Sequence, residues 1–361
     1  MSPSPFRLLL FPFCILYGFV TLVRNKLFDW GVLPSASFDL PIICLGNLSS
    51  GGTGKTPHTE FLVTLLQGQY KIAVLSRGYK RKTRGFLVVN SGHKASEVGD
   101  EPLQICRKFP EIIVAVHEQR RKGIKEIIKH QPEVKLILLD DAFQHRYVKP
   151  GLNILLTDYY RPFFDNHILP CGDLREAKSG AKRAHAIIVT KTPPVFSPLD
   201  RRHFLNKLSR YGTKNNVFFS KIEYGDWVPL QTQCKSPETS FKKIILFTGI
   251  ANTASIEEYL KRQCTELIIN RFPDHYQFTV ANLKNLKQQF REVIGKSKAI
   301  VITEKDAMRL QEEKFLNELK SLPVFYIPIR VVFQNSDQQK FEKYVWSFLS
   351  SKQAKLDQVQ N

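Results

Sequence analysis

Residues 41–60 read PIICLGNLSSGGTGKTPHTE, and this stretch decides the fold. Its first five residues are an apolar run with little alternation, which is typical of a parallel strand covered on both faces. A glycine-rich turn follows, and glycines permit backbone angles and close approaches that side chains forbid. Lys55 and Thr56 come directly after the last glycine and open the next helix. The order of strand, glycine-rich turn and helix predicts a phosphate-binding loop.

In such a loop, successive backbone N–H groups and the positive end of the helix form a cradle for an anion. Lys55 would reach the β- and γ-phosphates of a nucleotide, and the Thr56 hydroxyl would bind Mg²⁺. The pattern G-x-x-x-x-G-K-[ST] requires glycine where this chain has Ser49. A flexible glycine turn before a helix is the alternative, but it gives no reason for the lysine and threonine. The predicted nucleotide-binding residues are Ser49, Ser50, Gly51, Gly52, Thr53, Gly54, Lys55 and Thr56.

The composition implies a partner of negative charge. A chain of 361 residues favours two domains of ordinary size. The formal net charge of +20 implies nucleic acid, an acidic membrane surface or a phosphorylated substrate, and the basic residues are too evenly spread to choose among them. The six cysteines are scattered and form no C-x-x-C pair, so we expect reduced thiols in a cytosolic protein and no zinc site.

A strongly apolar segment at residues 8–23 is flanked by Arg7 on one side and by Arg24 and Lys26 on the other. A secretory signal peptide has this length, but it would export a phosphate-binding loop to a place without ATP. A spanning helix needs about 20 apolar residues, and this run is shorter and contains Pro12. We favour a helix on or in the inner leaflet, with its basic residues on lipid phosphates. A first helix packed on the protein's own core is the alternative.

Strand and helix patterns alternate along the rest of the chain, which predicts parallel sheets. We expect an α/β protein: a P-loop NTPase-type α/β/α sandwich, a second and smaller α/β/α domain, and an amino-terminal membrane-associated helix. A polar stretch with two prolines marks the boundary between the domains. The expected parts are residues 1–30 for the apolar helix, 31–218 for the P-loop domain, 219–240 for the linker and 241–361 for the smaller domain.

The strands of the P-loop domain are expected, after the strand that precedes the glycine turn, at residues 71–75, 112–116, 135–139, 152–157 and 186–190. In the smaller domain, strands are expected at residues 243–248, 266–269, 299–303 and 324–329, and a closing helix at 339–349. The segment 190–193, TKTP, ends a strand and could border a base pocket.

Acidic side chains follow the glycine turn at two places. Asp140 and Asp141 end an apolar strand, where a carboxylate can orient the magnesium shell or its water. A strand-end turn is the alternative for this pair. Asp100 lies two residues before Pro102, near the start of a helix, and is either the N-cap or a general base within reach of the phosphate site.

Further candidates lie in loops. An arginine near a transferring phosphoryl group stabilises its spreading charge, and Arg175 could do so, although a surface ion pair with Glu176 is the alternative. His275 lies beside an aspartate in a proline-broken loop, where a lone histidine is more often structural. Residues 303–306, TEKD, form a polar cluster at a strand end and are equally well explained as a helix cap with ion pairs.

Together these pieces resemble one family, the tetraacyldisaccharide 4′-kinases of lipid A biosynthesis. The motifs that carry the resemblance are GNLSSGGTGKTP, LSRGY, GDEP, LDDAFQHR, LPCGDLRE, TKTP, FTGIAN, FPDHYQF and ITEKDAMRL, in this order over about residues 6–329. A phosphate loop alone is common to many enzymes, whereas its combination with D-D-x-F-Q-H and L-R-E is much more specific. Two departures are Tyr276, where many relatives have a second histidine, and Ala142, where glycine often lies.

The resemblance implies transfer of the γ-phosphoryl group of ATP, with Mg²⁺, to the 4′-hydroxyl of a lipid A disaccharide 1-phosphate, which gives lipid IVA. It implies an aspartate–histidine pair that assists the hydroxyl, and this pair falls on Asp100 and His275. It places Arg175 at the phosphate side. The implied metal residues are Thr56, Asp140, Asp141 and Glu176. We further expect a monomer at the cytosolic face of the inner membrane, peripheral or monotopic, with no nucleic acid bound.

Two other classes of protein also contain a phosphate-binding loop and are alternatives to a lipid kinase. A nucleic-acid-dependent P-loop ATPase would explain the basic charge and predicts hydrolysis stimulated by DNA or RNA with steep salt dependence. It leaves the apolar amino terminus unexplained. A nucleotide-switched binding module would need no acceptor hydroxyl and no aspartate–histidine pair across two domains, so replacement of Asp100 should leave its function largely intact.

Overall fold

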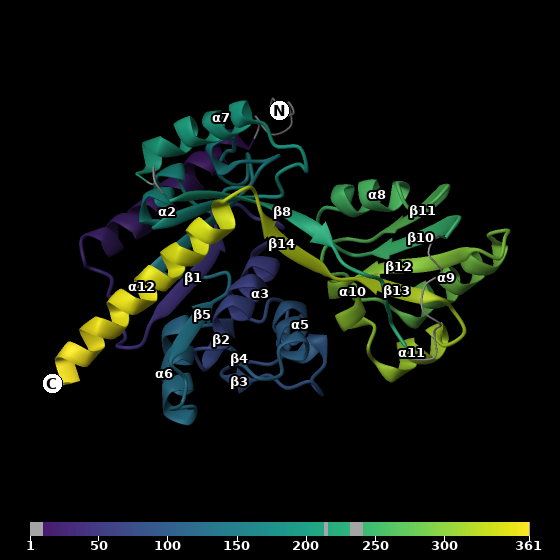
Figure 1. Ribbon diagram of the computed structural model, residues 1–361, viewed down its shortest axis with the longest axis horizontal. Coiled ribbons are helices and arrows are strands. Elements are labelled where there is room, and N and C mark those ends of the chain that lie inside the picture. Colours follow the sequence, from purple (N-terminus) through teal and green to yellow (C-terminus); the bar gives the residue numbers. More distant parts are fainter. Residues whose placement is uncertain (1–9, 213–215, 232–240, 361) are drawn as a thin grey trace.

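The computed structural model describes residues 10–212, 216–231 and 241–360, which form two α/β units side by side (Figure 1). Residues 1–9 of the expected amino-terminal helix and residues 232–240 of the expected linker, with Cys234, lie outside the described residues.

The large unit is built on a sheet that has nine strands within the described chain, in the order β14-β8-β7-β6-β1-β5-β2-β4-β3. The strands from β8 to β4 in this order pair in parallel, while β14 and β3 pair antiparallel at the two edges. Every residue of β1 is buried, as expected for a strand covered on both faces. The bounds are β1 (Ile42–Asn47), β2 (Ile72–Ser76), β3 (Leu87–Val88), β4 (Ile113–Val116), β5 (Leu136–Leu139), β6 (Leu152–Asp158), β7 (Ala186–Thr190), β8 (Val217–Tyr224) and β14 (Ile329–Phe333).

Helices cover both faces of this sheet. One apolar cluster joins α3, α5 and α12 to one face, and two others join α6 and α7 to the opposite face, which gives the expected α/β/α layers. The helices of the large unit are α2 (Phe11–Asp29), α3 (Lys55–Leu66), α4 (Ala95–Val98), α5 (Asp100–Lys108), α6 (Arg120–His130), α7 (Pro198–Leu208) and α12 (Asp337–Gln360).

The small unit has a sheet of five strands within the described residues, in the order β11-β10-β12-β13-β9, with β9 antiparallel at the edge. Helix α8 covers one face, and α9, α10 and α11 cover the other. Its elements are β9 (Val228–Pro229), β10 (Lys243–Thr248), α8 (Ala254–Lys261), β11 (Glu266–Arg271), α9 (Val280–Glu292), β12 (Lys298–Thr303), α10 (Glu304–Arg309), α11 (Glu313–Leu319) and β13 (Val324–Ile327).

The sheet to which each strand belongs corrects the expected domain ranges. The strand expected at 324–329 is two strands, because Pro328 has no N–H to donate and the chain changes sheets there. Beyond it, β14 pairs with β8 in the large sheet, and α12 packs on that sheet through Phe341, Val345 and Leu349. The assignment of residues 329–360 to the smaller unit was therefore wrong, and β8 also extends beyond the expected boundary at 218. Two strands, β8 and β14, thus connect the units (Figure 1).

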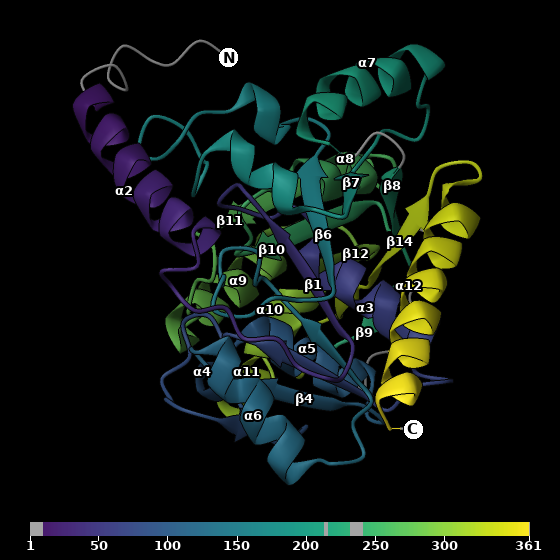
Figure 2. The ribbon, with the colours of Figure 1, turned by 90° about the vertical axis from the view of Figure 1, so that its left-hand side faces the viewer.

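Helix α2 lies along the edge of the large unit (Figure 2). Pro12 lies in its first turn, where the missing N–H is tolerated, so it does not interrupt the helix. A helix packed on the protein's own core would be buried, but Phe13 and Phe19 are 62% and 64% exposed, and that alternative is wrong. By length and composition α2 is apolar enough to cross a membrane. Its exposed apolar side chains are Phe11, Phe13, Ile15, Leu16, Phe19, Val20, Leu22 and Val23.

Candidate active site

The glycine-rich turn between β1 and α3 has the backbone of an anion-binding loop. Gly51 and Gly54 have φ values of 115° and 84°, which glycine adopts without strain. Gly54 is the N-cap of α3, so the first amides of the helix and the positive end of its dipole face the turn. A Cβ atom added to Gly51 or Gly52 would meet no atom of the described chain within 4 Å. The turn therefore has open space beside its backbone.

Lys55 is held at this turn by two oxygen atoms. Its Nζ lies 3.4 Å from Asn47 Oδ1 and 3.6 Å from a carboxylate oxygen of Asp141. Asn47, the last residue of β1, also donates Nδ2 to Thr53 Oγ1 at 2.8 Å. Thr56, the predicted magnesium residue, is 3% exposed in the first turn of α3. Lysine and threonine thus lie in the first turn of the helix that follows the glycine turn.

The turn is fixed to the sheet by neighbouring side chains. The His58 ring contacts the Gly54 carbonyl oxygen at 2.7 Å through Nδ1 and Ser220 Oγ on β8 at 2.9 Å through Nε2. Burial lowers the pKa of His58 to about 4, so the ring is neutral at pH 7. Thr190 Oγ1 at the end of β7 donates to the Thr53 carbonyl oxygen at 2.9 Å. These contacts tie the loop to β7 and β8.

The acidic pair at the end of β5 lies against the same turn. Asp140 is 2% exposed and accepts a hydrogen bond from Thr59 Oγ1 on α3 at 3.1 Å. Burial raises the pKa of Asp140 to about 6, so its charge is poorly compensated by the chain alone. Burial also disfavours the charge of Asp141, but Lys55 and Arg175 outweigh it and hold the pKa of Asp141 below its usual range. Arg175 Nη1 lies 3.3 Å from Asp141.

The donor atoms here fit Mg²⁺. This cation prefers oxygen ligands, and nucleotide sites hold it with one or two carboxylates, leaving other positions to phosphate and water. The Thr56 hydroxyl and the Asp140 and Asp141 carboxylates are donors of this kind, and the poorly compensated Asp140 favours a nearby cation. Among the described residues, no group of three or more His, Cys, Asp or Glu side chains could hold a metal.

Glu176 has other partners than those expected. Its Oε2 accepts from Asn25 Nδ2 of α2 at 2.7 Å, and its Oε1 accepts from Gln144 and from Arg183, the latter at 2.8 Å. The surface ion pair with Arg175 is not formed, because Arg175 pairs with Asp141. A metal role for Glu176 would require loss of bonds on both oxygens. The side chain instead ties α2 to the loop beside the active site.

Asp100 and His275 meet across the two units. Asp100 is the first residue of α5, and Gly99 is the N-cap, so the N-cap interpretation of Asp100 was wrong. His275 Nδ1 lies 2.9 Å from Asp100 Oδ2. Arg309 Nε, on α10, donates to the same oxygen at 2.8 Å, and its Nη2 also donates there. The Tyr79 and His275 rings pack edge to face, with ring centroids 5.0 Å apart.

Charge keeps Asp100 ionised despite burial. Burial alone would raise its pKa, but the hydrogen bond from His275 and the charge of Arg309 lower the pKa of Asp100 to about 2. Next to it, burial disfavours the charge of Glu101, but Lys305, His275 and Lys55 together hold the pKa of Glu101 below its usual range. Both His275 and Lys55 therefore act on the charge of Glu101, which lies between the aspartate–histidine pair and the glycine turn in the sequence of electrostatic contacts.

Left-handed backbone conformations occur at residues of the acidic pair, of the aspartate–histidine pair and of neighbouring loops. Lys80, Asp141, Lys191 and His275 all have φ values between 47° and 58°, in the left-handed region that non-glycine residues rarely adopt. Such conformations persist where the surrounding structure fixes them, and they are common at active sites. Lys191, in the expected base-pocket segment, donates to the Gly52 carbonyl oxygen and lies 2.8 Å from Asp158. It therefore contacts the glycine turn itself.

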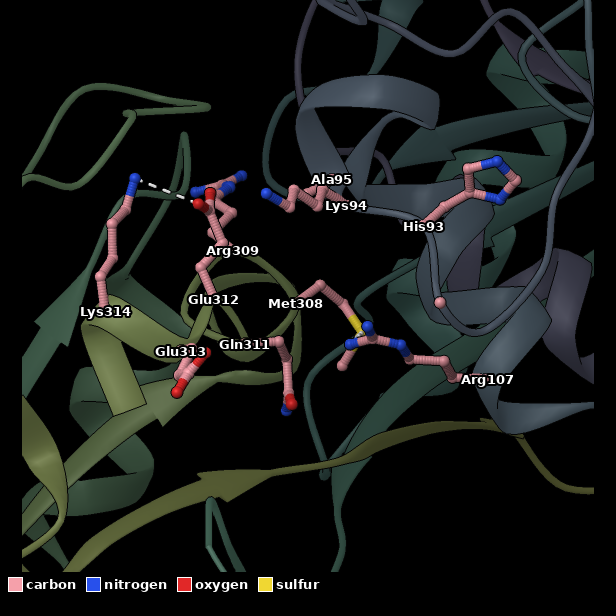
Figure 3. Close-up of a pocket in the computed structure, with 11 residues that line it drawn as sticks. His93, Lys94, Ala95, Arg107, Met308, Arg309, Gln311, Glu312, Glu313 and Lys314 are labelled. Carbon is pink, nitrogen blue, oxygen red and sulfur yellow. Dashed lines mark hydrogen bonds and ion pairs between the residues drawn. The ribbon is translucent and has the colours of Figure 1, made fainter. Parts of the chain in front are cut away.

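A cavity of about 420 Å³ lies between the units beside Arg309. Figure 3 shows Lys94 and Arg107 of the large unit on one side of it and Met308 and Arg309 of α10 on the other. Arg107 Nη1 lies 3.7 Å from the Met308 sulfur. None of the residues that line this cavity belongs to the glycine turn, so it is not the nucleotide site. It shows that open space adjoins the contact between α5 and α10.

The structure brings the sequence-predicted residues together in two groups. Lys55, Asp141 and Arg175 form one group with the glycine turn, and Asp100 and His275 form the other. Asn47 and Arg309 were missed, although both lie within quoted motifs, GNLSSGGTGKTP and ITEKDAMRL. Their importance comes from contacts with residues distant in the sequence or across a turn, which no local pattern reveals. The residues 303–306 are a helix cap: Thr303 Oγ1 accepts from the Asp306 amide at 3.2 Å.

A glycine turn after the first strand, a lysine at its end and acidic residues on the neighbouring strand define the class of P-loop nucleotide-binding enzymes. The family model described as tetraacyldisaccharide-1-P 4′-kinase (LpxK) matches residues 6–350. The chain belongs to this family. The nucleic-acid-dependent and nucleotide-switched ATPase alternatives are not favoured.

Relatives and a solved structure agree with this assignment. The tetraacyldisaccharide 4′-kinase of Bacteroides thetaiotaomicron is 43% identical over 352 residues, covering 94% of this chain and 92% of its own. That of Flavobacterium psychrophilum is 44% identical over 347 residues, covering 96% and 97%. The crystal structure of the "apo" form of LpxK from Aquifex aeolicus in complex with ATP is 26% identical, with a TM-score of 0.71 over 95% of this chain and 99% of that one. The similarity confirms the expected fold class.

Proposed function

We propose that the chain transfers the γ-phosphoryl group of ATP to the 4′-hydroxyl of a tetraacyldisaccharide 1-phosphate, with the aspartate–histidine pair acting on that hydroxyl. The sugar oxygen bonds to the γ-phosphorus, the bond from that phosphorus to the β–γ bridging oxygen breaks, and ADP leaves. Such a transfer needs positioning and charge neutralisation more than covalent chemistry by the protein. The observation that carries the proposal is the 2.9 Å contact between His275 Nδ1 and Asp100 Oδ2.

The pair, and not the carboxylate alone, receives the hydroxyl proton. With its pKa at about 2, Asp100 is a weak base by itself. The bonds from His275 and Arg309 all end on its Oδ2. Asp100 therefore orients the imidazole and stabilises the positive charge that the ring gains with the proton. His275 Nε2, on the far side of the ring from Asp100 and 3.8 Å from Asp274 Oδ2, is the atom that would take the proton of the acceptor hydroxyl.

The glycine turn and its neighbours act on the nucleotide. Lys55 neutralises β- and γ-oxygens, and Arg175 stabilises the charge that spreads over the transferring group. Thr56, Asp140 and Asp141 would hold Mg²⁺, which supplies charge neutralisation at the same oxygens when bound. The pairs Lys55–Asp141 and Arg175–Asp141 keep both cations in place until the phosphates arrive.

A transfer assay tests the function. Purified chain is mixed with ATP labelled at the γ-phosphorus and a tetraacyldisaccharide 1-phosphate in detergent, with a control that lacks the lipid. We expect label on the lipid, as a second phosphate at the 4′ position, and little free labelled phosphate without lipid. Release of labelled phosphate at one rate with or without lipid, and faster with DNA or RNA, would instead indicate an ATPase.

We further propose that α2 places the active site at the cytosolic face of the inner membrane. One side of α2 is fixed to the large unit, where Tyr17 donates to the Arg175 carbonyl oxygen at 3.0 Å and Asn25 donates to Glu176. The other side is apolar and exposed. A substrate with several acyl chains stays in the bilayer, so a helix that is both embedded and bonded to the catalytic loop brings the hydroxyl to the site.

Replacement of Phe13 and Phe19 by glutamate is expected to weaken binding to anionic vesicles by about 10²-fold or more, because burial of each phenylalanine contributes roughly 1.5–3 kcal/mol. Both side chains are more than 60% exposed, so the fold should persist. Co-sedimentation with vesicles measures the effect. Ile294→Glu, an 84% exposed apolar residue of the small unit, is the matched control and should bind normally. Full vesicle binding by the double variant would show that α2 is not the anchor.

A further inference from the structure

Helices α5 and α10 join the two units through a series of paired polar side chains. At one end Arg309 bonds to Asp100. One residue further along α5, Glu101 Oε1 lies 2.6 Å from Lys305 Nζ. Both acids are largely buried, so each pair replaces water that would otherwise solvate the charge. Such pairs fix one alignment of the helices, because a shift along the axis would separate every partner at once.

Glu304 extends this series to the helix of the glycine turn. Gln104 Nε2 on α5 donates to Glu60 Oε1 at 2.6 Å and to Glu304 Oε2 at 3.3 Å. Lys108 Nζ lies 2.6 Å from Glu60 Oε2 and 3.5 Å from Glu304 Oε1. Glu60 belongs to α3, the helix that begins at Lys55. The Gln104 amide and the Lys108 ammonium thus each contact two carboxylates. These are Glu60 of the large unit and Glu304 of the small unit.

The apolar contacts between the units cannot set this alignment. The largest apolar cluster contains residues of both units, but apolar burial is not directional and tolerates sliding. Glu304 is a costly residue at such a junction: burial and the charge of Glu60 raise the pKa of Glu304 to about 7. The charge and hydrogen bond of Lys108 and a hydrogen bond with the Ile329 backbone on β14 offset that cost. They do so in one geometry, which makes the position of α10 specific.

The position of α10 in turn controls the loop of His275. Arg309 Nη1 donates to the Gly249 carbonyl oxygen at 2.9 Å, and the His275 amide donates to the same oxygen at 3.2 Å. Gly249 also donates its amide to Asp306 on α10 at 3.2 Å. A displacement of α10 therefore moves the imidazole with it.

We propose that Glu304 is a positioning residue that fixes the small unit on α3 and α5, so that His275 reaches Asp100 over the bound nucleotide. The proposal rests on the role proposed above for the aspartate–histidine pair. Its partners from the elements packed around it are Glu60 on α3, Gln104 and Lys108 on α5, and the Ile329 backbone on β14. It touches neither the glycine turn nor the imidazole, so its effect must act through the alignment of the units.

The test combines kinetics with a distance measurement on the full chain. Spin labels are introduced by bio-orthogonal chemistry at Lys125 on α6 and Lys284 on α9, both exposed and in different units. We expect Glu304→Ala to broaden the distance distribution and to lower kcat by about 10²-fold, the size of effect that a misplacement near 1 Å produces. The dissociation constant of ATP should not change. Glu304→Gln, which keeps hydrogen-bonding groups toward Lys108 and Gln104, should restore both the distribution and kcat.

Lys108→Gln provides a second variant if Glu304→Ala folds poorly, and it should broaden the distribution as well. The matched control is Glu266→Ala, which removes an ion pair with Lys243 of 2.6 Å inside the small unit and should leave distances and kcat unchanged. An unchanged distance distribution in both Glu304→Ala and Lys108→Gln would overturn the proposal, whatever the value of kcat. A wild-type chain without lipid kinase activity would refute the proposed function, while the distance measurement would still decide the role of Glu304.

Discussion

Replacement of His275 by alanine is expected to lower kcat for lipid phosphorylation by about 10²–10⁴-fold, the range for loss of a general acid–base group. The dissociation constant of ATP should stay unchanged, because the imidazole contacts Asp100 and Tyr79 and not the glycine turn. Single-turnover transfer from labelled ATP, with ATP binding measured separately, gives both quantities. The proposed action of this histidine, which comes from the small unit, on the acceptor hydroxyl predicts that kcat falls while ATP binding is kept.

The control for this variant is His130→Ala, which removes a histidine that is 51% exposed on α6 and should leave turnover unaffected. A His275→Ala variant with wild-type turnover would remove the imidazole from the mechanism. A variant that loses ATP binding and turnover together would show that the loop of His275 serves the nucleotide and not the acceptor.

Replacement of Lys55 by alanine is expected to lower kcat/KM by about 10²–10³-fold, as for removal of one preorganised donor to a developing charge. The ammonium lies between Asn47 and Asp141 at the start of α3, and no other cation of the described turn has this position. Lys55→Arg should not restore activity, because the planar guanidinium is larger than an ammonium and places its donors differently. Steady-state kinetics at varied ATP concentration measure the loss.

Lys129→Ala, on the exposed surface of α6, is the matched control and should behave as wild type. A loss of less than about threefold in Lys55→Ala would mean that the glycine turn does not hold the transferring phosphate, since such a change is below 1 kcal/mol. It would then be a turn that only connects β1 to α3.

Much of the large unit could be predicted because its signals are local. A buried apolar run followed by G-G-T-G-K-T identifies β1, the turn and the start of α3 from adjacent residues. The break at Pro328 could not be predicted in this way. The residues on both sides are apolar and extended, and only their pairing with different sheets shows that β13 and β14 belong to different units. Sheet membership depends on partners far along the chain, which hydrophobic periodicity does not encode.

The residues of the candidate site were likewise predictable only where their signals are local. Residues next to one another, such as Lys55 and Thr56, could be assigned roles from spacing. Asp100 and His275 are 175 residues apart, and only the family resemblance paired them before the structure placed them 2.9 Å apart. Arg309 escaped notice because an arginine on a helix is normally solvated. Its importance follows from bonds to Asp100 that exist only once the units are in contact.

The most direct test of catalysis across the two units is a double-mutant cycle on Asp100→Asn and His275→Ala, with single-turnover transfer to the lipid as the readout. When two residues act as one unit, the effects of replacing them are strongly non-additive. We predict that the double variant is about as slow as the slower single variant, with ATP binding retained in all three. If the fold-losses in transfer rate of the two single variants multiply in the double variant, the two side chains act independently. That result would contradict a shared role at the sugar hydroxyl.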